Sequence, residues 1–168
     1  MDHLIGQKLP DVILASGNST LINPAQLAGL SVIFCYPYTG RPGHADPVGW
    51  DDIPGAHGST PQALGFSKRY EEFERLDVKV FGLSFQDAEW QNEFVERTAL
   101  RVPLLSDNER IFSTALALPT FRAGENDYLR RITILSRGDT IFGVRYPVKV
   151  PENDADETLA LLRRSANP

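Results

Sequence analysis

The chain has 168 residues, of which 42% are hydrophobic and 23% charged, as in ordinary globular proteins and unlike disordered ones. This length predicts one domain, residues 1–168. The 17 basic and 22 acidic residues give a net charge of −5, which argues against nucleic acid or an anionic membrane as partner. The single cysteine excludes an internal disulfide. No apolar run approaches the ~18 residues of a membrane span and no secretory signal is evident, so we expect a cytoplasmic protein.

Strand and helix patterns alternate along the chain. Short β-branched apolar runs such as 30–36 predict buried strands, and apolar residues at helical spacing in 61–76 predict a helix. Ser59 or Thr60 is expected to cap that helix, with Pro61 in its first turn. The expected elements are strand 30–36, helix 61–76, strand 78–84, helix 87–100, strand 102–105, helix 111–118, strands 131–135 and 140–146, and helix 155–164.

The order of these elements predicts an α/β protein with a central mixed sheet and helices on both faces. Crossover helices join the early strands, which should therefore be parallel. The tight-turn sequence Arg137-Gly138-Asp139 should make the last two strands an antiparallel hairpin. This arrangement is the pattern of a thioredoxin-like fold.

Residues 39–58 interrupt the alternation. They include five glycines and three prolines and show no periodicity. An irregular stretch of this length is usually functional or mobile. It connects the end of a buried strand to the start of a helix, the edge at which open α/β sheets bind ligands. We expect it to cover a binding pocket and to be the least ordered part of the chain.

Five motifs resemble those of peroxiredoxins, in the family's order, and the resemblance covers about residues 5–162. It implies a thiol peroxidase that reduces hydrogen peroxide and organic hydroperoxides through a cysteine thiolate, with no cofactor. The motifs are Ile5-Gly6-Gln7-Lys8-Leu9-Pro10-Asp11-Val12 (the opening G-x-x-x-P-D-F), Phe34-Cys35-Tyr36-Pro37 (F-x-Y-P), Gly58-Ser59-Thr60-Pro61-Gln62-Ala63-Leu64 (G-C-T-x-Q-x-C of the bacterioferritin-comigratory class), Pro103-Leu104-Leu105-Ser106-Asp107 (P-L-L-S-D) and Arg130-Arg131-Ile132-Thr133-Ile134 (the strand of the family's arginine).

The resemblance also implies which residues form the site. Ser59 stands at the position of the peroxidatic cysteine, at a helix N-terminus that favours an anion. Arg131 is implied as the cation that lowers a thiol pKa and holds the peroxide. Strand alternation should turn Arg131 and Thr133 inward and Arg130 toward solvent. The residues expected to shape the pocket are Tyr36, Pro37, Thr39 and Thr60.

The serine at position 59 departs from the family pattern. A serine hydroxyl stays protonated near neutral pH, whereas a thiol starts near pKa 8.5 and is easily lowered, so the chain as written should not reduce peroxide through Ser59. Leu64 replaces the resolving cysteine, which implies that thioredoxin, glutaredoxin or a small thiol is the reductant. We expect Ser59 to be an engineered replacement of cysteine. The alternative is a naturally non-catalytic thioredoxin-fold binding module; monomer and homodimer both remain open.

Other residues permit other interpretations. Arg41-Pro42-Gly43-His44 also resembles the family's T-P-G-C, but the following Asp46-Pro47 argues against a helix start there. Cys35, within an apolar strand, is expected to be an inert buried thiol. His57 and Ser59 are too close in sequence to align readily as hydrolase base and nucleophile. The metal-type side chains His44, Asp46, Asp51, Asp52 and His57 have no zinc-site spacing and are expected to be solvated, with no metal.

Overall fold

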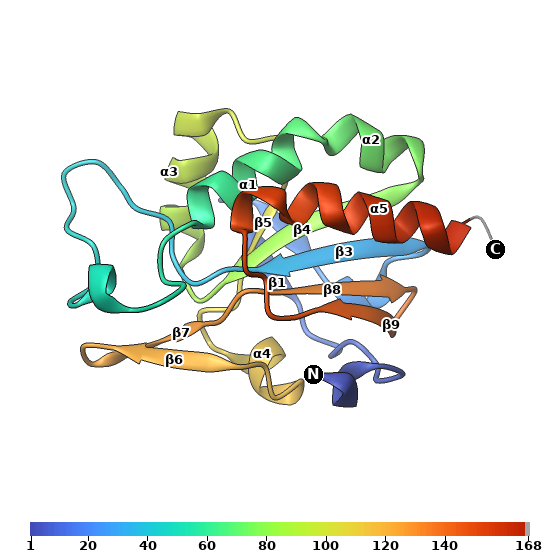
Figure 1. The fold of residues 1–168 in the computed structure, drawn as a ribbon, viewed down its shortest axis with the longest axis horizontal. Coiled ribbons are helices and arrows are strands. Elements are labelled where there is room, and N and C mark those ends of the chain that lie inside the picture. Colours follow the sequence, from blue (N-terminus) through green and yellow to red (C-terminus); the bar gives the residue numbers. More distant parts are fainter. Residues whose placement is uncertain (167–168) are drawn as a thin grey trace.

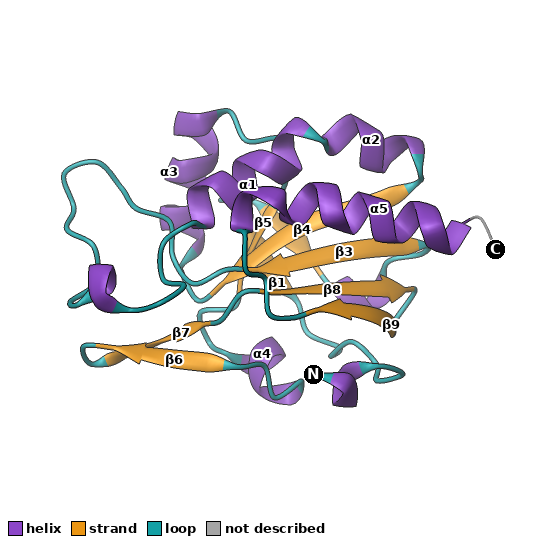
Figure 2. Cartoon of the chain, in the orientation of Figure 1, coloured by secondary structure: helices purple, strands orange, loops and turns teal. Residues whose placement is uncertain are grey.

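The computed structural model describes residues 1–166, which form a central seven-stranded sheet with helices on both faces and a separate two-stranded hairpin (Figures 1 and 2). The sheet order is β2-β1-β5-β4-β3-β8-β9, and β6 pairs with β7. The strands are β1 (Leu14–Ser16), β2 (Thr20–Ile22), β3 (Leu30–Cys35), β4 (Val78–Ser84), β5 (Leu104–Ser106), β6 (Thr120–Ala123), β7 (Asn126–Leu129), β8 (Ile132–Arg137) and β9 (Thr140–Arg145). The helices are α1 (Ser59–Lys68), α2 (Tyr70–Arg75), α3 (Ala88–Thr98), α4 (Ile111–Ala115) and α5 (Asp154–Ala166), with 3₁₀ turns at Asp2–Leu4, Pro24–Gln26, Trp50–Asp52 and Pro151–Asn153.

The inner strand β3 is buried on both faces, as its continuous apolar sequence predicts. Val32 and Phe34 pack in one core cluster with residues of α1, α2, α3 and α5. Ile33 and Cys35 point the other way, into a second cluster that includes side chains of α4 and the N-terminal segment. β3 pairs in parallel with β4 and antiparallel with β8. The mixed sheet expected from the sequence is confirmed.

Four strands are not predicted by the sequence pattern. β1 and β2 have three residues each, and β6 and β7 have four each and expose several side chains, so none shows a clear apolar alternation. The single helix expected over 61–76 is two helices, α1 and α2, separated at Arg69. The expected hairpin between β8 and β9 is present.

No helix within residues 1–166 is long and apolar enough to cross a membrane.

Candidate functional site

Ser59 is the first residue of α1, and its side chain is turned into the molecule. It is only 3% exposed, and its Oγ accepts a hydrogen bond from the Tyr38 N–H at 3.4 Å. The expected side-chain cap is therefore wrong, because Gly58 occupies the N-cap position and no side chain caps the helix. Uncapped N–H groups and the positive end of the helix dipole make this end favourable for an anion.

Arg131 lies immediately before β8 and is buried beside the start of α1, with 6% exposure. Its Nη2 donates to the Ala56 carbonyl oxygen at 3.0 Å. A Cβ placed on Gly58 would lie 3.3 Å from the same nitrogen, which measures how closely the guanidinium approaches the helix N-terminus. The other two guanidinium nitrogens, Nε and Nη1, are buried without a hydrogen-bond partner in the described chain. The neighbouring Arg130 is exposed, as expected, and lies over the Phe121 ring.

The charge of Arg131 persists despite its burial. Burial lowers the pKa of the guanidinium to about 10, and the negative charge of Asp154 acts in the opposite direction. A pKa of about 10 leaves the group cationic at neutral pH. The start of α1 therefore combines a helix N-terminus with a buried positive charge.

A cavity of about 240 Å³ opens at Ser59. Most of its wall comes from the irregular segment that precedes α1, so this segment does adjoin the site. The residues that line the cavity are Tyr38, Gly40, Asp46, Trp50, His57, Gly58, Ser59, Thr60 and Pro61.

Of the four residues expected to shape the pocket, only Thr60 borders this cavity. Tyr36 is fully buried in the core beside Phe34, and burial raises the pKa of its phenol. Thr39 is 1% exposed, and its N–H and hydroxyl both donate to Gln86 Oε1 at 3.0 Å. Neither side chain lines the cavity, because Tyr36 packs in the core cluster of β3 and Thr39 is held by Gln86.

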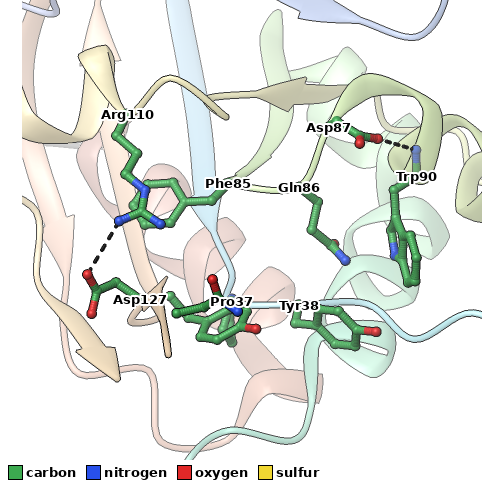
Figure 3. Close-up of a pocket in the computed structure, with 10 residues that line it drawn as sticks. Pro37, Tyr38, Phe85, Gln86, Asp87, Trp90, Arg110 and Asp127 are labelled. Atoms are coloured by element: carbon green, nitrogen blue, oxygen red, sulfur yellow. Dashed lines mark hydrogen bonds and ion pairs between the residues drawn. The ribbon is translucent and has the colours of Figure 1, made fainter. Parts of the chain in front are cut away.

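The fourth expected residue, Pro37, borders a second cavity of about 250 Å³ at the C-terminal ends of β3 and β4 (Figure 3). Tyr38 separates the two cavities, since it lines both. Figure 3 shows the Arg110 guanidinium over the Phe85 ring and directed toward the Asp127 carboxylate, 3.4 Å away.

The segment 39–58 is anchored by Trp50, which lies in the 3₁₀ turn Trp50–Asp52. Trp50 is 4% exposed and packs against Tyr38, Phe121 and Tyr128 at ring-centroid distances of 5.0 to 5.6 Å. The loop therefore packs on the β6–β7 hairpin, which supplies Phe121 and Tyr128. Trp50 is therefore a packing residue beside the cavity.

The metal-type side chains of the loop are solvated, although three of them gather. Ligand atoms of Asp46, Asp51 and His57 lie within 4.8 Å of one another, and all three residues are exposed. His57 Nε2 is 2.6 Å from Asp51 Oδ1, while Ser59 Oγ is bonded to the Tyr38 N–H. His57 and Ser59 thus have different partners, as expected for residues that are not a base and its nucleophile. His44 is exposed in a turn well before α1, so the alternative motif alignment fails.

Cys35 is fully buried on β3, and burial raises the pKa of its thiol strongly. The expectation of an inert core cysteine is confirmed. Because it is the only cysteine of the chain, no thiol is present at the cavity.

The sequence does not indicate that Gln62 and Asp154 form a buried polar pair. Gln62, one turn into α1, and Asp154, the first residue of α5, are both fully buried and hydrogen-bonded to each other at 3.0 Å. In the sequence, Asp154 resembles its neighbours Asp156 and Glu157, acidic residues in the first turn of a helix. No local signal distinguishes the buried acid from the exposed ones.

Comparison with known proteins places these features in a family context. Residues 54–137 match the model of the AhpC/TSA family. The chain is 30% identical to peroxiredoxin bcp1 of Schizosaccharomyces pombe over 61% of this chain and 46% of that protein. It is 27% identical to a peroxiredoxin of Ignicoccus hospitalis over 95% of this chain and 64% of that protein. The matches therefore span less than two thirds of these relatives' lengths.

The fold is also similar to that of a solved structure, a cysteine-to-serine mutant of Xylella fastidiosa PrxQ. The TM-score is 0.79 at 23% identity, and the superposition covers 97% of each chain. This similarity shows the thioredoxin-like peroxiredoxin fold.

Proposed function

The chain belongs to the AhpC/TSA family of peroxiredoxins, and on that basis we propose that the start of α1 is a hydroperoxide-reducing site. In it, position 59 is the place of the nucleophile and Arg131 is the catalytic cation. The observation that carries the proposal is the buried Arg131 guanidinium beside the N-terminus of α1, with two nitrogens that lack partners in the described chain. Both features stabilise an anion at residue 59.

With a thiol at position 59, the reaction is a displacement on oxygen. The thiolate sulfur attacks one oxygen of the hydroperoxide, so that an S–O bond forms while the O–O bond breaks. The departing hydroxide or alkoxide takes up a proton, which leaves a sulfenic acid and water or an alcohol. Arg131 and the α1 N–H groups lower the thiol pKa and stabilise the charge that develops on oxygen. Thr60 borders the cavity that would hold the substrate, whereas Tyr36, Pro37 and Thr39 do not line it.

The chain with Ser59 does not perform this step, because a serine hydroxyl remains protonated at neutral pH. We propose that serine freezes the site in a form that resembles the reduced enzyme. A cycle with cysteine at position 59 needs a thiol from outside the chain, since Leu64 cannot resolve the sulfenic acid. Thioredoxin, glutaredoxin or a small thiol fits that role. The reducing cytoplasm supplies such thiols, which favours a cytoplasmic location.

A second candidate function is a non-catalytic binding module with the thioredoxin fold, acting as monomer or homodimer. The observation in its favour is that the only thiol, Cys35, is fully buried and remote from solvent. The two candidates differ in whether the surroundings of residue 59 still activate a thiol.

Stopped-flow measurement of Ser59→Cys with hydrogen peroxide tests the proposal. We expect a second-order rate far above that of free cysteine, because the dipole and the cation are already in place. Ser67→Cys, two turns further along α1, is the matched control and should react like a free thiol. If Ser59→Cys reacts no faster than free cysteine, the peroxidase proposal is wrong and the binding module is favoured.

A further inference from the structure

Asp154 lies at the centre of a buried polar network. It is fully buried at the start of α5, and its Oδ2 accepts hydrogen bonds from Gln62 Nε2 at 3.0 Å and from Thr133 Oγ1 at 2.6 Å. Its Oδ1 accepts from Arg145 Nε at 3.0 Å and from Thr158 Oγ1 at 3.5 Å. A buried carboxylate is tolerated only when it is satisfied in this way.

The partners of Asp154 belong to the two elements that carry the candidate site. Gln62 is on α1, three residues after Ser59 and therefore close to the same side of the helix. Thr133 is on β8, two residues after Arg131, so both side chains point to the same side of the backbone. One oxygen atom, Oδ2, therefore ties the helix of residue 59 to the strand that follows Arg131.

Asp154 also contributes charge. Its carboxylate forms an ion pair with Arg145, which in turn contacts Glu157 on the surface. Its negative charge also opposes the effect of burial on the pKa of Arg131. Asp154 is therefore linked to Arg131 by charge as well as to the neighbouring elements by hydrogen bonds.

We infer that Asp154 is a positioning residue, which fixes residue 59 relative to Arg131 by holding α1 against β8. The inference rests on the proposed function, since it assumes that these two residues act together. It differs from a merely structural role in one respect. Loss of the Asp154 bonds should impair the reaction that needs both residues more than a reaction that needs only an accessible thiolate.

The test uses the full chain with Ser59→Cys. To this we add Asp154→Ala, which removes the acceptor, or Asp154→Asn, which keeps an acceptor oxygen for Gln62 and Thr133 but removes the charge. The matched control is Asp156→Asn, an exposed acid on the same helix that pairs with Arg69. For each variant we measure the rate with hydrogen peroxide, the rate with iodoacetamide and the pKa of the thiol at position 59.

We expect Asp154→Ala to lower the ratio of the peroxide rate to the alkylation rate by about tenfold or more, because small misplacements of reacting groups have effects of this order. Asp154→Asn should restore most of the ratio, and Asp156→Asn should leave it unchanged. Because Ala and Asn both lack the charge, loss of charge does not account for a difference between them. Equal ratios and equal thiol pKa values for the two variants would overturn the inference.

Two further outcomes are also decisive. If Ser59→Cys itself reacts no faster than free cysteine, the proposed function fails, and the pKa of the thiol at position 59 then tests the positioning role of Asp154. A higher thiol pKa in Asp154→Ala than in Asp154→Asn supports that role. Equal thiol pKa values in the two variants overturn it. If Asp154→Ala does not fold, Thr133→Val removes only the 2.6 Å bond. An unchanged rate ratio in Thr133→Val would then contradict the inference.

Discussion

Two adjacent arginines have opposite environments, and this contrast gives the sharpest test at the residue scale. Arg131 is buried beside α1, whereas Arg130 is exposed over the Phe121 ring. In the Ser59→Cys background we expect Arg131→Met to slow the peroxide reaction by about 10²–10³-fold, the usual effect of losing a charge-assisted contact to a developing anion. Arg130→Met should change it little. Stopped-flow kinetics measures both, and equal small effects would mean that Arg131 is not the catalytic cation.

Cys35 predicts a pH dependence of stability. Burial raises the pKa of its thiol in the folded state, so the folded chain keeps the proton that the unfolded chain loses near pH 8.5. The stability contributed by this group is therefore complete below pH 8.5 and is lost as pH rises above it. Between pH 7 and 9.5 the loss should be about 1 kcal/mol.

Urea unfolding at both pH values checks this prediction. Cys35→Ala is the control, because other groups that titrate in this range, such as Tyr36 at its upper end, affect both proteins alike. The difference between the two proteins should shrink as the pH rises. A difference that does not change with pH would show that Cys35 is accessible in the folded chain.

At the scale of elements, the start of α1 depends on a glycine. Gly58 has φ of +119°, and a Cβ there would lie 2.7 Å from Pro151 Cγ and 3.3 Å from Arg131 Nη2. We expect Gly58→Ala to destabilise the fold by about 1–3 kcal/mol more than Gly55→Ala. Gly55 is the matched control, since its φ is +80° with no heavy atom within 4 Å of its Cβ position.

Thermal or urea unfolding of the two alanine variants measures that difference. In the Ser59→Cys background, Gly58→Ala should also slow the peroxide reaction, because the new methyl group displaces either Arg131 or Pro151 in the turn before α5. Identical stabilities of the two variants would mean that Pro151 and Arg131 can move away from a Cβ on residue 58 at no cost in folding free energy.

The elements that the sequence predicted are those whose apolar pattern is decisive. β3, β4 and β8 bury β-branched or aromatic runs, β9 is partly buried, and the helices α3 and α5 have a clear apolar side. The cap of α1 was mispredicted because Ser59 has a long-range partner, the Tyr38 N–H, that helix statistics do not contain. The short strands of the β6–β7 hairpin are stabilised by the packing of Trp50, which lies far away in the sequence.

At the scale of the whole molecule, family motifs indicated the candidate site, but contacts across the fold determine its surroundings. The motifs that contain Ser59 and Arg131 identified the two candidate residues, and the fold brings both to the start of α1. Asp154 was missed because its importance comes from Gln62 and Thr133, which only the folded chain brings to it. The sequence likewise could not show that Tyr36 and Thr39 do not line the cavity.

The segment 39–58 is not uniform, although its sequence predicts low order throughout. Residues 42–46 are exposed, and within residues 1–166 their backbone forms one backbone–backbone hydrogen bond, from the His44 N–H to the Arg41 carbonyl oxygen. Residues 50–56, by contrast, are held by the buried indole of Trp50 and by the hydrogen bond that Arg131 donates to the Ala56 carbonyl oxygen. Segments with few buried contacts open at low free-energy cost. We therefore expect residues 41–48 of the loop to open more readily than residues 50–56.

Hydrogen exchange with site resolution tests this division. Amides of 41–48 should exchange early, those of 50–56 later, and those of Val32–Phe34 last, because β3 is an inner strand that is paired on both sides. Trp50→Ala should make 50–56 exchange as early as 41–48 while β3 stays protected. In the Ser59→Cys background it should also widen the cavity, and so raise the rate with cumene hydroperoxide relative to hydrogen peroxide. If exchange in 50–56 and the rate ratio are both unchanged in Trp50→Ala, the indole neither anchors the loop nor limits access to residue 59.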